Sequence, residues 1–311
     1  MSWLAFRWTW ELAAPLFVGT SPAGALNRCR MYVPARAVWG AVTAELARHE
    51  QGDGEGAPRR YEEVGSDLTT NFRFTYLYPA EQVRGNWQAW LPTYSAGRGL
   101  NWEREDEAEA AIAVADRAFR RRILHTRPST AIDPRSDTAA DGSLRETECL
   151  QPHWRDAAGR DAGPVALVGY VFARQADVNP SGVIERLAPI RSLLVGGDTR
   201  YGLGRLDRLS CDPANRLFGR TVELSGDEPV VRSATTLAHT SAQGAMTGAL
   251  EALGGWDIGR QKPLGSDGAP LWAPGSKAPN GAASFRIDEQ GIWRLEDEGT
   301  LQATTNEGIS R

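Results

Sequence analysis

The chain has 311 residues, of which 41% are hydrophobic, so it can bury one large core or two smaller ones. Its formal net charge of −4 excludes a basic field over the whole molecule. Nearly all the positive charge is arginine, with lysine only at Lys262 and Lys277. Arginine suits phosphate contacts and base stacking, although a GC-rich genome would give the same bias.

The cysteines and the N-terminal residues bear on the compartment. Cys29, Cys149 and Cys211 form no C-x-x-C pair, so neither a zinc site nor a redox pair is indicated. An odd number of cysteines is typical of a reducing compartment. The apolar first 19 residues carry Arg7 and Glu11 and lack a basic leader, which argues against a signal peptide or a membrane span. We expect a cytoplasmic protein.

The first half of the chain gives four predicted elements. Residues 3–12 alternate apolar side chains at period two, which predicts a strand. A helix is predicted to open near Pro34 and run to residue 49, because proline suits the first helical turn. Aromatic alternation over 71–79 predicts a second strand. Acidic residues at the start of 103–124 and arginines at its end predict a long helix.

The second half begins with a long segment, residues 125–146, that shows neither a helical nor a strand period and is predicted to be a loop. Residues 164–174 predict a buried strand, and 182–195 a helix interrupted by Pro189. A glycine-rich loop follows, and 204–211 predict another strand. Residues 212–311 are rich in glycine and proline, with short strand-like pieces at 220–224, 283–287 and 291–295.

This order of elements predicts an α+β protein. It is compatible with a ferredoxin-like (RRM-like) βαββαβ unit over residues 1–211, carrying a large insertion at about 50–163. Residues 212–311 are then a C-terminal extension, mostly loops and short strands.

The glycine loop raises the question of which phosphate it could bind. Gly197 and Gly202 have the spacing of a Walker A loop, but Leu203-Gly204 stands where Lys-Ser/Thr is required. A dinucleotide-binding loop runs from a strand into a helix, whereas this one is predicted to run from a helix into a strand. A polynucleotide backbone and a tight turn that binds nothing remain as alternatives.

Three stretches together resemble the RAMP superfamily of CRISPR RNA-binding proteins. The first is the loop from Gly196-Gly197 to Gly202-Leu203-Gly204, and the second is the segment 14–42, with its strand, turn and tight entry into a helix. The third, residues 129–148, is similar to the thumb of the backbone subunits of type III effector complexes. Ile132-Asp133, Ala139 and Glu148 fit that pattern.

The resemblance implies a subunit that binds guide RNA on the glycine loop and the start of the first helix. Its thumb would pass between guide and target RNA, and its partners would be both RNAs and other RAMP subunits. No cofactor and no metal are implied. The candidate RNA-binding residues are Gly196, Gly197, Arg200, Tyr201, Gly202, Gly204, Arg205, Arg28, Arg30, Arg36, Trp39, Arg120, Arg121, Arg122, Ile132 and Arg135.

Cleavage is not expected. Cleaving members of the family have an aspartate in the turn after the first strand, where this sequence has Asn27 and no acid from 19 to 31. Asp133 and His49 are the only acid–base candidates. Two alternatives stay open: a RAMP endoribonuclease that cuts target or precursor RNA, and an end-capping subunit that binds mainly protein. The alternative to RNA contact is a solvated helix face for Arg120–Arg122 and a place in the core for the Trp39 ring.

Overall fold

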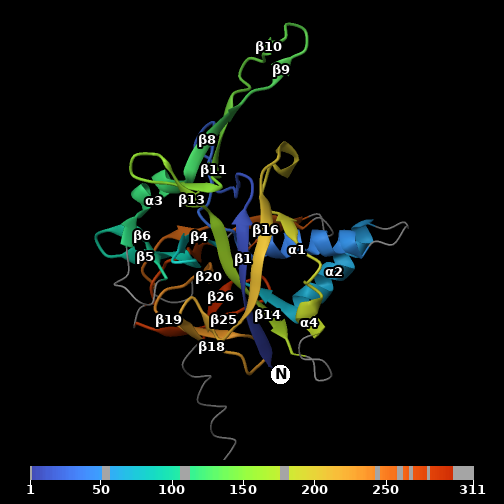
Figure 1. Cartoon of the computed structure of the whole chain (residues 1–311), viewed down its shortest axis with the longest axis vertical. Coiled ribbons are helices and arrows are strands. Elements are labelled where there is room, and N and C mark those ends of the chain that lie inside the picture. The colour runs from blue at the N-terminus through green and yellow to red at the C-terminus, as the bar shows by residue number, and fades with distance from the viewer. Residues whose placement is uncertain are drawn as a thin grey trace, which may run out of the picture.

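A nine-stranded sheet runs through the molecule in the order β15-β16-β1-β14-β4-β5-β6-β7, with β3 also paired to β14 (Figure 1). The structure is a computed structural model. It describes residues 2–50, 57–105, 113–175, 182–241, 246–257, 262–265, 269–278 and 281–296. Mixed helices and antiparallel sheets confirm the α+β class.

Strand β1 (Trp3–Leu12) is the centre of this sheet. It pairs antiparallel with β14 (Ala166–Arg174) on one side and with β16 (Arg205–Ala214) on the other. On the far side of β14 lie β3 (Phe72–Phe74) and β4 (Tyr78–Val83), also antiparallel. The strands predicted at 3–12, 164–174 and 204–211 are thus confirmed. The strand predicted at 71–79 is divided between β3 and β4.

The first helix is confirmed and a second one was missed. Helix α1 (Ala35–His49) starts directly after Pro34, whose φ of −61° already suits a helix. Helix α2 (Ala57–Asn71) packs on α1, where Gly65 gives the ring of Trp39 room to approach. The sequence did not predict α2 because this helix contains a glycine and ends in two threonines and an asparagine, which are poor helix formers.

The predicted helix at 182–195 is wrong beyond its first turn. Helix α4 (Gly182–Glu185) ends before Pro189, and the chain then forms β15 (Ser192–Leu194), the edge strand beside β16. Proline cannot donate a helical hydrogen bond and restricts the residue before it. The glycine loop therefore joins two antiparallel strands rather than a helix and a strand.

The predicted helix at 103–124 is also largely wrong. The sheet continues through β5 (Asn86–Ser95), β6 (Gly99–Arg104) and β7 (Ala113–Ala115), and only α3 (Asp116–Ile123) is helical. Residues 106–112 of that prediction lie outside the described residues. Trp102 on β6 is buried and stacks on Phe119 of α3, with ring centroids 4.5 Å apart. Burial of this aromatic pair outweighs the helical charge pattern.

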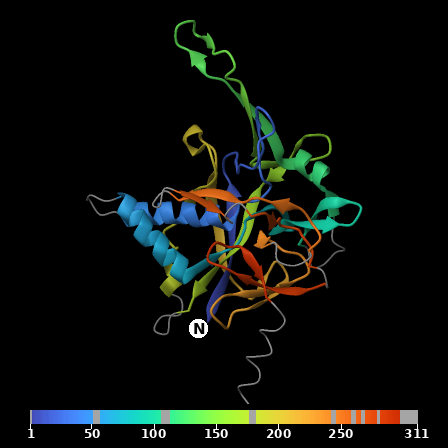
Figure 2. The ribbon, with the colours of Figure 1, turned by 180° about the vertical axis from the view of Figure 1, so that it is seen from behind.

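Residues 124–150 form a hairpin that projects from the body, here called the arm (Figures 1 and 2). Its strands are β8 (Leu124–Ser129) and β11 (Arg145–Leu150), and β9 (Ile132–Asp133) pairs with β10 (Thr138–Ala139) near the tip. The prediction of a loop was wrong here because both faces of the arm are mostly exposed, so no apolar alternation marks its strands. The short hairpin β12 (His153–Arg155) and β13 (Asp161–Pro164) follows.

The C-terminal residues build a second sheet, confirming the short strands that the sequence indicated. Leu217, Val231, Phe285 and Trp293 from this part belong to the same buried cluster as β1 and α1. The strands are β17 (Arg216–Leu217), β18 (Arg220–Glu223), β19 (Val230–Ser233), β20 (Thr240–Ser241), β21 (Leu250–Glu251), β24 (Leu271–Trp272), β25 (Ala283–Ile287) and β26 (Trp293–Leu295), with β22 (Gly254–Asp257) and β23 (Lys262–Gly265) pairing apart. Among the described helices, none is long and apolar enough to cross a membrane.

Candidate nucleic-acid interface

The three stretches that the sequence analysis singled out meet at one end of β1. Phe17 and Pro15, in the chain leaving β1, accept backbone hydrogen bonds from Gly197 (2.9 Å) and Gly204 (2.8 Å) of the glycine loop. Leu16 exchanges two backbone hydrogen bonds with Leu150 at the base of the arm, at 2.9 and 2.8 Å. The turn, the arm and the glycine loop are therefore held together by main-chain contacts, and both ribbon views show the three segments at the same end of the molecule (Figures 1 and 2).

The turn after β1 also joins the arm directly. Strand β2 (Leu26–Asn27) pairs parallel with β11, so that Asn27 lies opposite Thr147. The Asn27 amide donates to the Thr147 hydroxyl at 3.4 Å, and the N–H of Cys29 donates to the Glu148 carboxylate at 2.9 Å. Glu148, part of the resemblance, thus fixes the turn against the arm.

Close packing explains two of the loop's glycines. Gly196 and Gly204 have φ of 86° and 81°, and a Cβ at either would collide with a backbone carbonyl oxygen, that of Phe17 or Val195. Gly202 also has positive φ, but the space around it is open. Only glycine combines this backbone geometry with so close an approach.

Four of the backbone N–H groups of the loop, residues 196–204, donate hydrogen bonds inside the chain. Besides Gly197 and Gly204, Tyr201 donates to the Asp198 carbonyl at 2.8 Å and Gly202 to Thr199 at 3.1 Å, around the short 3₁₀ turn η1 (Thr199–Tyr201). The N–H groups of Gly196, Asp198, Thr199, Arg200 and Leu203 donate no hydrogen bond within the described chain. The loop can therefore offer a partner both these N–H groups and the side chains at its tip. Arg200 and Tyr201 are both exposed there.

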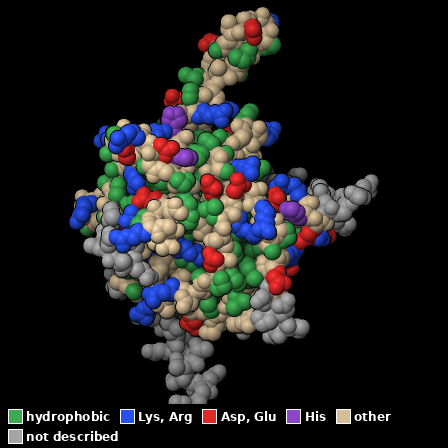
Figure 3. All heavy atoms as spheres, in the orientation of Figure 1, with side chains coloured by type: hydrophobic (Ala, Val, Ile, Leu, Met, Phe, Trp, Pro, Cys, Tyr) green, Lys and Arg blue, Asp and Glu red, His purple; other side chains and the backbone are tan. Residues whose placement is uncertain are grey.

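Four exposed arginines lie on these converging segments and are called the arm-base arginines: Arg28, Arg127, Arg145 and Arg200. The guanidinium carbon of Arg145 lies 5.8 Å from the centroid of the Tyr201 ring, which links the arm to the loop tip. Within the described part of the chain, none of the four has a carboxylate partner. Blue and purple side chains gather where the arm leaves the body (Figure 3). Such unpaired charge is suited to phosphates.

Arg127 and Arg145 were not among the predicted RNA contacts. They occupy neighbouring positions on β8 and β11, where Arg127 lies opposite Thr147 and Arg145 opposite Ser129. Because 125–146 was predicted as a loop, the strand pairing that brings them onto one face was not visible. Alternation of His125 and Arg127 was the available signal.

Several predicted arginines have partners within the chain. Arg30 binds Glu251 and the Gly19 carbonyl, and Arg205 pairs with Asp207 at 3.0 Å. Arg120 pairs with Asp116 at 2.8 Å. These contacts satisfy the charges without RNA.

Arg122 is similarly engaged. It pairs with Glu81 at 2.6 Å and lies 4.8 Å from the centroid of the Trp154 ring. Its neighbour Arg121 is exposed, and Arg36 is half-buried near the start of α1. The RNA contacts predicted for these residues remain predictions.

Trp39 and the tip of the arm lie apart from the converging segments. The Trp39 ring packs on α2, with its centroid 6.2 Å from that of Tyr61. This contact matches the ordinary reading of Trp39 as a core aromatic, so we leave it out of the proposed interface. Ile132, 58% exposed, and Arg135 lie at the outer end of the arm, where they could reach a partner only at a distance from the glycine loop.

The two acid–base candidates have local structural contacts. Asp133 accepts the N–H of Arg135 at 2.9 Å through its side chain and that of Asp137 at 2.9 Å through its carbonyl, which builds the turn at the arm tip. His49 lies at the C-terminal end of α1, 3.3 Å from Glu45. A 15-residue helix rises about 20 Å, so His49 is far from the helix start. The structure does not bring Asp133 and His49 together.

The cysteines are poor nucleophiles or metal ligands in this setting. Burial raises the pKa of Cys29 to about 12 and those of Cys149 and Cys211 to about 11, so the thiols stay protonated at neutral pH. Among the described residues, no group of three or more His, Cys, Asp or Glu side chains is placed to hold a metal ion.

A buried polar network ties the C-terminal sheet to the turn after β1. Glu251 on β21 accepts hydrogen bonds from Arg30, from the Tyr32 hydroxyl (3.2 Å) and from His239 Nε2 (3.2 Å). His239 is fully buried, and its Nδ1 lies 2.6 Å from the Tyr76 hydroxyl. Burial alone would raise the pKa of Glu251, but the hydrogen bond from His239 and the charge of Arg30 prevail and lower it to about 2. The ionised carboxylate therefore anchors the turn.

Comparison with known proteins gives only weak likenesses. No protein-family model matches the chain, and no curated protein matches it. A chain in the cryo-EM structure of the Type III-B Cmr-beta bound to cognate target RNA and AMPPnP is 14% identical, with 87% of this chain and 84% of that chain covered and a TM-score of 0.45. One chain from the Cmr-beta structure bound to cognate target RNA and one from the apo structure are each 10% identical. Each match covers 66% of this chain and 96% of the other chain, with TM-scores of 0.41 and 0.39, respectively. All three TM-scores are below 0.5, so we draw no conclusion about this chain from these likenesses.

Proposed function

We propose that this chain is an RNA-binding subunit of a type III CRISPR effector complex that holds the guide RNA without cutting RNA. The observation that carries the proposal is the convergence of turn, arm base and glycine loop around arginines without carboxylate partners. Each of these segments carries part of the sequence resemblance to RAMP proteins. A phosphate backbone laid across the arm-base arginines would meet charge that nothing in the described chain neutralises.

The strand order supports the same proposal. Strand β1 lies between β16 and β14, with β3 and β4 beyond β14, and all neighbours are antiparallel. Numbered within a βαββαβ unit, this order is 4-1-3-2, which we take as ferredoxin-like and therefore RAMP-like. On this reading β4 through β13 extend the unit, and the arm is the thumb that would separate guide from target RNA.

The absence of cleavage is part of the proposal. Asn27 stands in the turn where cleaving relatives are expected to have an aspartate, and its amide is bonded to Thr147. An amide cannot act as a base near neutral pH. Neighbouring RAMP subunits would be the protein partners, and the guide and its target would be the RNA partners.

The test is RNA binding by the full chain with matched arginine variants. Arg28→Ala and Arg145→Ala remove charge from the converging segments, whereas Arg98→Ala removes the same charge from an exposed turn between β5 and β6. We expect each of the first two to weaken binding of a single-stranded RNA and Arg98→Ala to leave it within twofold. Equal effects of all three variants, or no RNA binding by the wild type, would refute the proposed function.

A further inference from the structure

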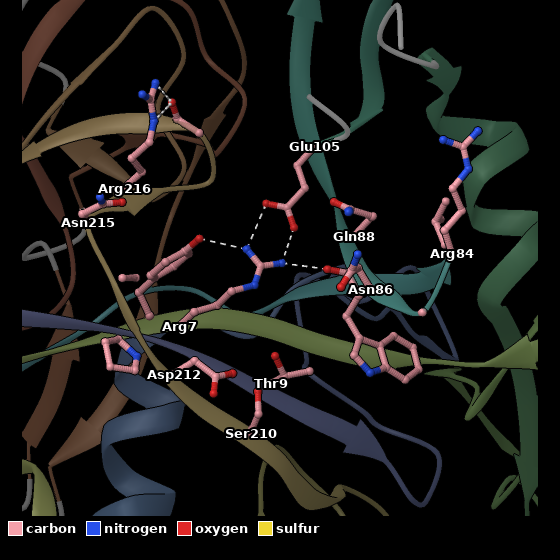
Figure 4. A pocket seen from close by; sticks show the side chains of 17 residues that line it. Arg7, Thr9, Arg84, Asn86, Gln88, Glu105, Ser210, Asp212, Asn215 and Arg216 are labelled. Atoms are coloured by element: carbon pink, nitrogen blue, oxygen red, sulfur yellow. Dashed lines mark hydrogen bonds and ion pairs between the residues drawn. The ribbon is translucent and has the colours of Figure 1, made fainter. Parts of the chain in front are cut away.

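A second site lies on the sheet, away from the arm-base arginines. A cavity of about 770 Å³ opens between β1, β16 and the β4–β5 hairpin (Figure 4). This volume lies within the range of small-molecule sites in proteins. Its floor comes from Arg7 and Thr9 of β1 and from Tyr170 of β14, and its walls come from β16 and from residues 83–88.

The charge at the floor is neutralised. Arg7 binds both oxygens of Glu105, and it also donates to the Tyr170 hydroxyl at 2.9 Å and to the Trp87 carbonyl at 2.8 Å. With both terminal nitrogens hydrogen-bonded and a carboxylate beside it, Arg7 has little attraction left for an anion. The floor therefore favours a neutral polar group over a phosphate.

The walls carry hydrogen-bonding groups that have no partner. The side chains of Thr9, Asn86, Gln88, Ser210 and Asp212 all line the cavity. These side chains make no hydrogen bond within the described part of the chain, and Figure 4 marks no interaction for them. Thr9 is only 3% exposed, yet its hydroxyl is left for an occupant. Asn86 and Asp212 are exposed and Gln88 and Ser210 are half-buried, so these four groups meet solvent in the free chain and stay available to hydrogen-bond an occupant.

The remaining lining completes a site for a flat ring. Trp87 supplies an aromatic side chain at one wall, and the exposed Arg216 lies at the rim. Arg216 uses Nε and one terminal nitrogen on the Gly219 carbonyl and has no carboxylate partner among the described residues. A planar group with mixed donors and acceptors, attached to a phosphate at the rim, matches this distribution. Unpaired nucleotides are recognised by such stacking and edge contacts.

We infer that this cavity binds a single unpaired nucleobase. The carboxylate of Asp212 can only accept hydrogen bonds, so it favours a base whose edge carries an amino group. Uracil is disfavoured because its single edge donor, N3–H, lies between two carbonyl oxygens that a carboxylate repels. The base can belong to an RNA strand or to a free nucleotide, since both offer the same ring and edge. The RNA source rests on the proposed function, and the free-nucleotide source does not.

The first experiment uses free nucleotides. Ligand-observed NMR on the full chain should detect AMP, GMP and CMP more strongly than UMP, with no response from ribose 5-phosphate. Gln88→Ala combined with Ser210→Ala should weaken the response at least fivefold. Gln82→Ala on the same hairpin, outside the cavity lining, should not change it, and thermal melts should show that all variants fold.

The second experiment uses an abasic scan of a short single-stranded RNA. If a base of the RNA enters the cavity, removing it at one position should weaken binding by about five- to a hundredfold, the range for stacking of one base. That sensitivity should vanish in the Gln88→Ala, Ser210→Ala variant and persist in Arg145→Ala.

The outcomes separate the two hypotheses. In one outcome the chain binds RNA, but no abasic position weakens binding more in the wild type than in the Gln88→Ala, Ser210→Ala variant, and both proteins bind free nucleotides equally. That result overturns the nucleobase site and leaves the proposed function intact. A chain that binds nucleotides through the cavity but binds no RNA overturns the proposed function and keeps the site, with a free nucleotide as occupant. Binding of neither overturns both.

Discussion

Arg145 on the arm and Tyr201 at the tip of the glycine loop face each other, with the guanidinium carbon 5.8 Å from the ring centroid. This contact connects two segments that are more than 50 residues apart in the sequence. It also leaves the charge of Arg145 unpaired, because a ring face attracts a cation without neutralising it. The contact thus orients the Arg145 side chain, for which a phosphate contact is proposed above.

The salt dependence of RNA binding should report these contacts. For single strands, the slope of log affinity against log salt falls by about 0.7 for each phosphate contact removed. We expect Arg28→Ala and Arg145→Ala each to lower the slope by about that amount, and Arg98→Ala to leave it unchanged. Fluorescence anisotropy of a labelled RNA between about 50 and 200 mM salt measures it. An affinity insensitive to salt would favour the protein-binding alternative.

The two positive-φ glycines at the end of the loop should differ sharply on substitution. Gly202→Ala meets only backbone strain, roughly 1–2 kcal/mol, because the surrounding space is open. Gly204→Ala adds a collision with the Val195 carbonyl and should destabilise the fold by clearly more. Urea unfolding of both variants tests this. Equal losses would show that the loop does not pack on β15 and the turn as described.

Stability at low pH should depend on Glu251. Folding lowers its pKa from 4.5 to about 2, so the ionised carboxylate stabilises the folded state above the higher value. That stabilisation, of the order of 3 kcal/mol, is lost as the pH falls from 4.5 to 2.

The isosteric variant isolates this contribution. Glu251→Gln should be less stable than the wild type at pH 6, and the difference should shrink as the pH approaches 2. Chemical denaturation at a series of pH values gives both curves. Parallel curves for the two proteins would contradict the network around His239 and Arg30.

The arginines of α3 should serve stability more than RNA binding. Arg122 pairs with Glu81 and covers the Trp154 ring, so Arg122→Ala should cost about 1–3 kcal/mol of unfolding free energy. Arg121 is exposed, and Arg121→Ala should stay within about 0.5 kcal/mol. Thermal and urea unfolding compare them. A large loss of RNA affinity in folded Arg122→Ala would instead restore the predicted RNA contact.

RNA cleavage should be absent. The assembled complex, incubated with a complementary target, is expected to leave the RNA intact opposite this subunit, because Asn27 cannot take a proton and Asp133 builds a turn. Sequencing gels of labelled target give the readout. Cuts that disappear in Asn27→Ala or Asp133→Ala, tested separately, would show that the subunit is catalytic.

The sequence by itself determined the elements that its apolar pattern marks. Alternating apolar side chains predicted β1, and an apolar residue at every fourth position after Pro34 predicted α1. A continuous apolar run predicted β14, which is buried on both faces. The importance of the glycine loop was also readable, since four glycines in nine residues signal backbone that other residues cannot adopt.

Only the tertiary structure decided where the exposed and long-range parts lie. The strands of the arm show no apolar alternation because most of their side chains are exposed, and the pairing of Trp102 with Phe119 overrode a helical charge pattern. Which arginines are free depends on partners far away in sequence: Arg30 meets Glu251, while Arg145 meets no carboxylate in the described chain. Charge pairing is set by folding across the whole chain, so local sequence cannot reveal it.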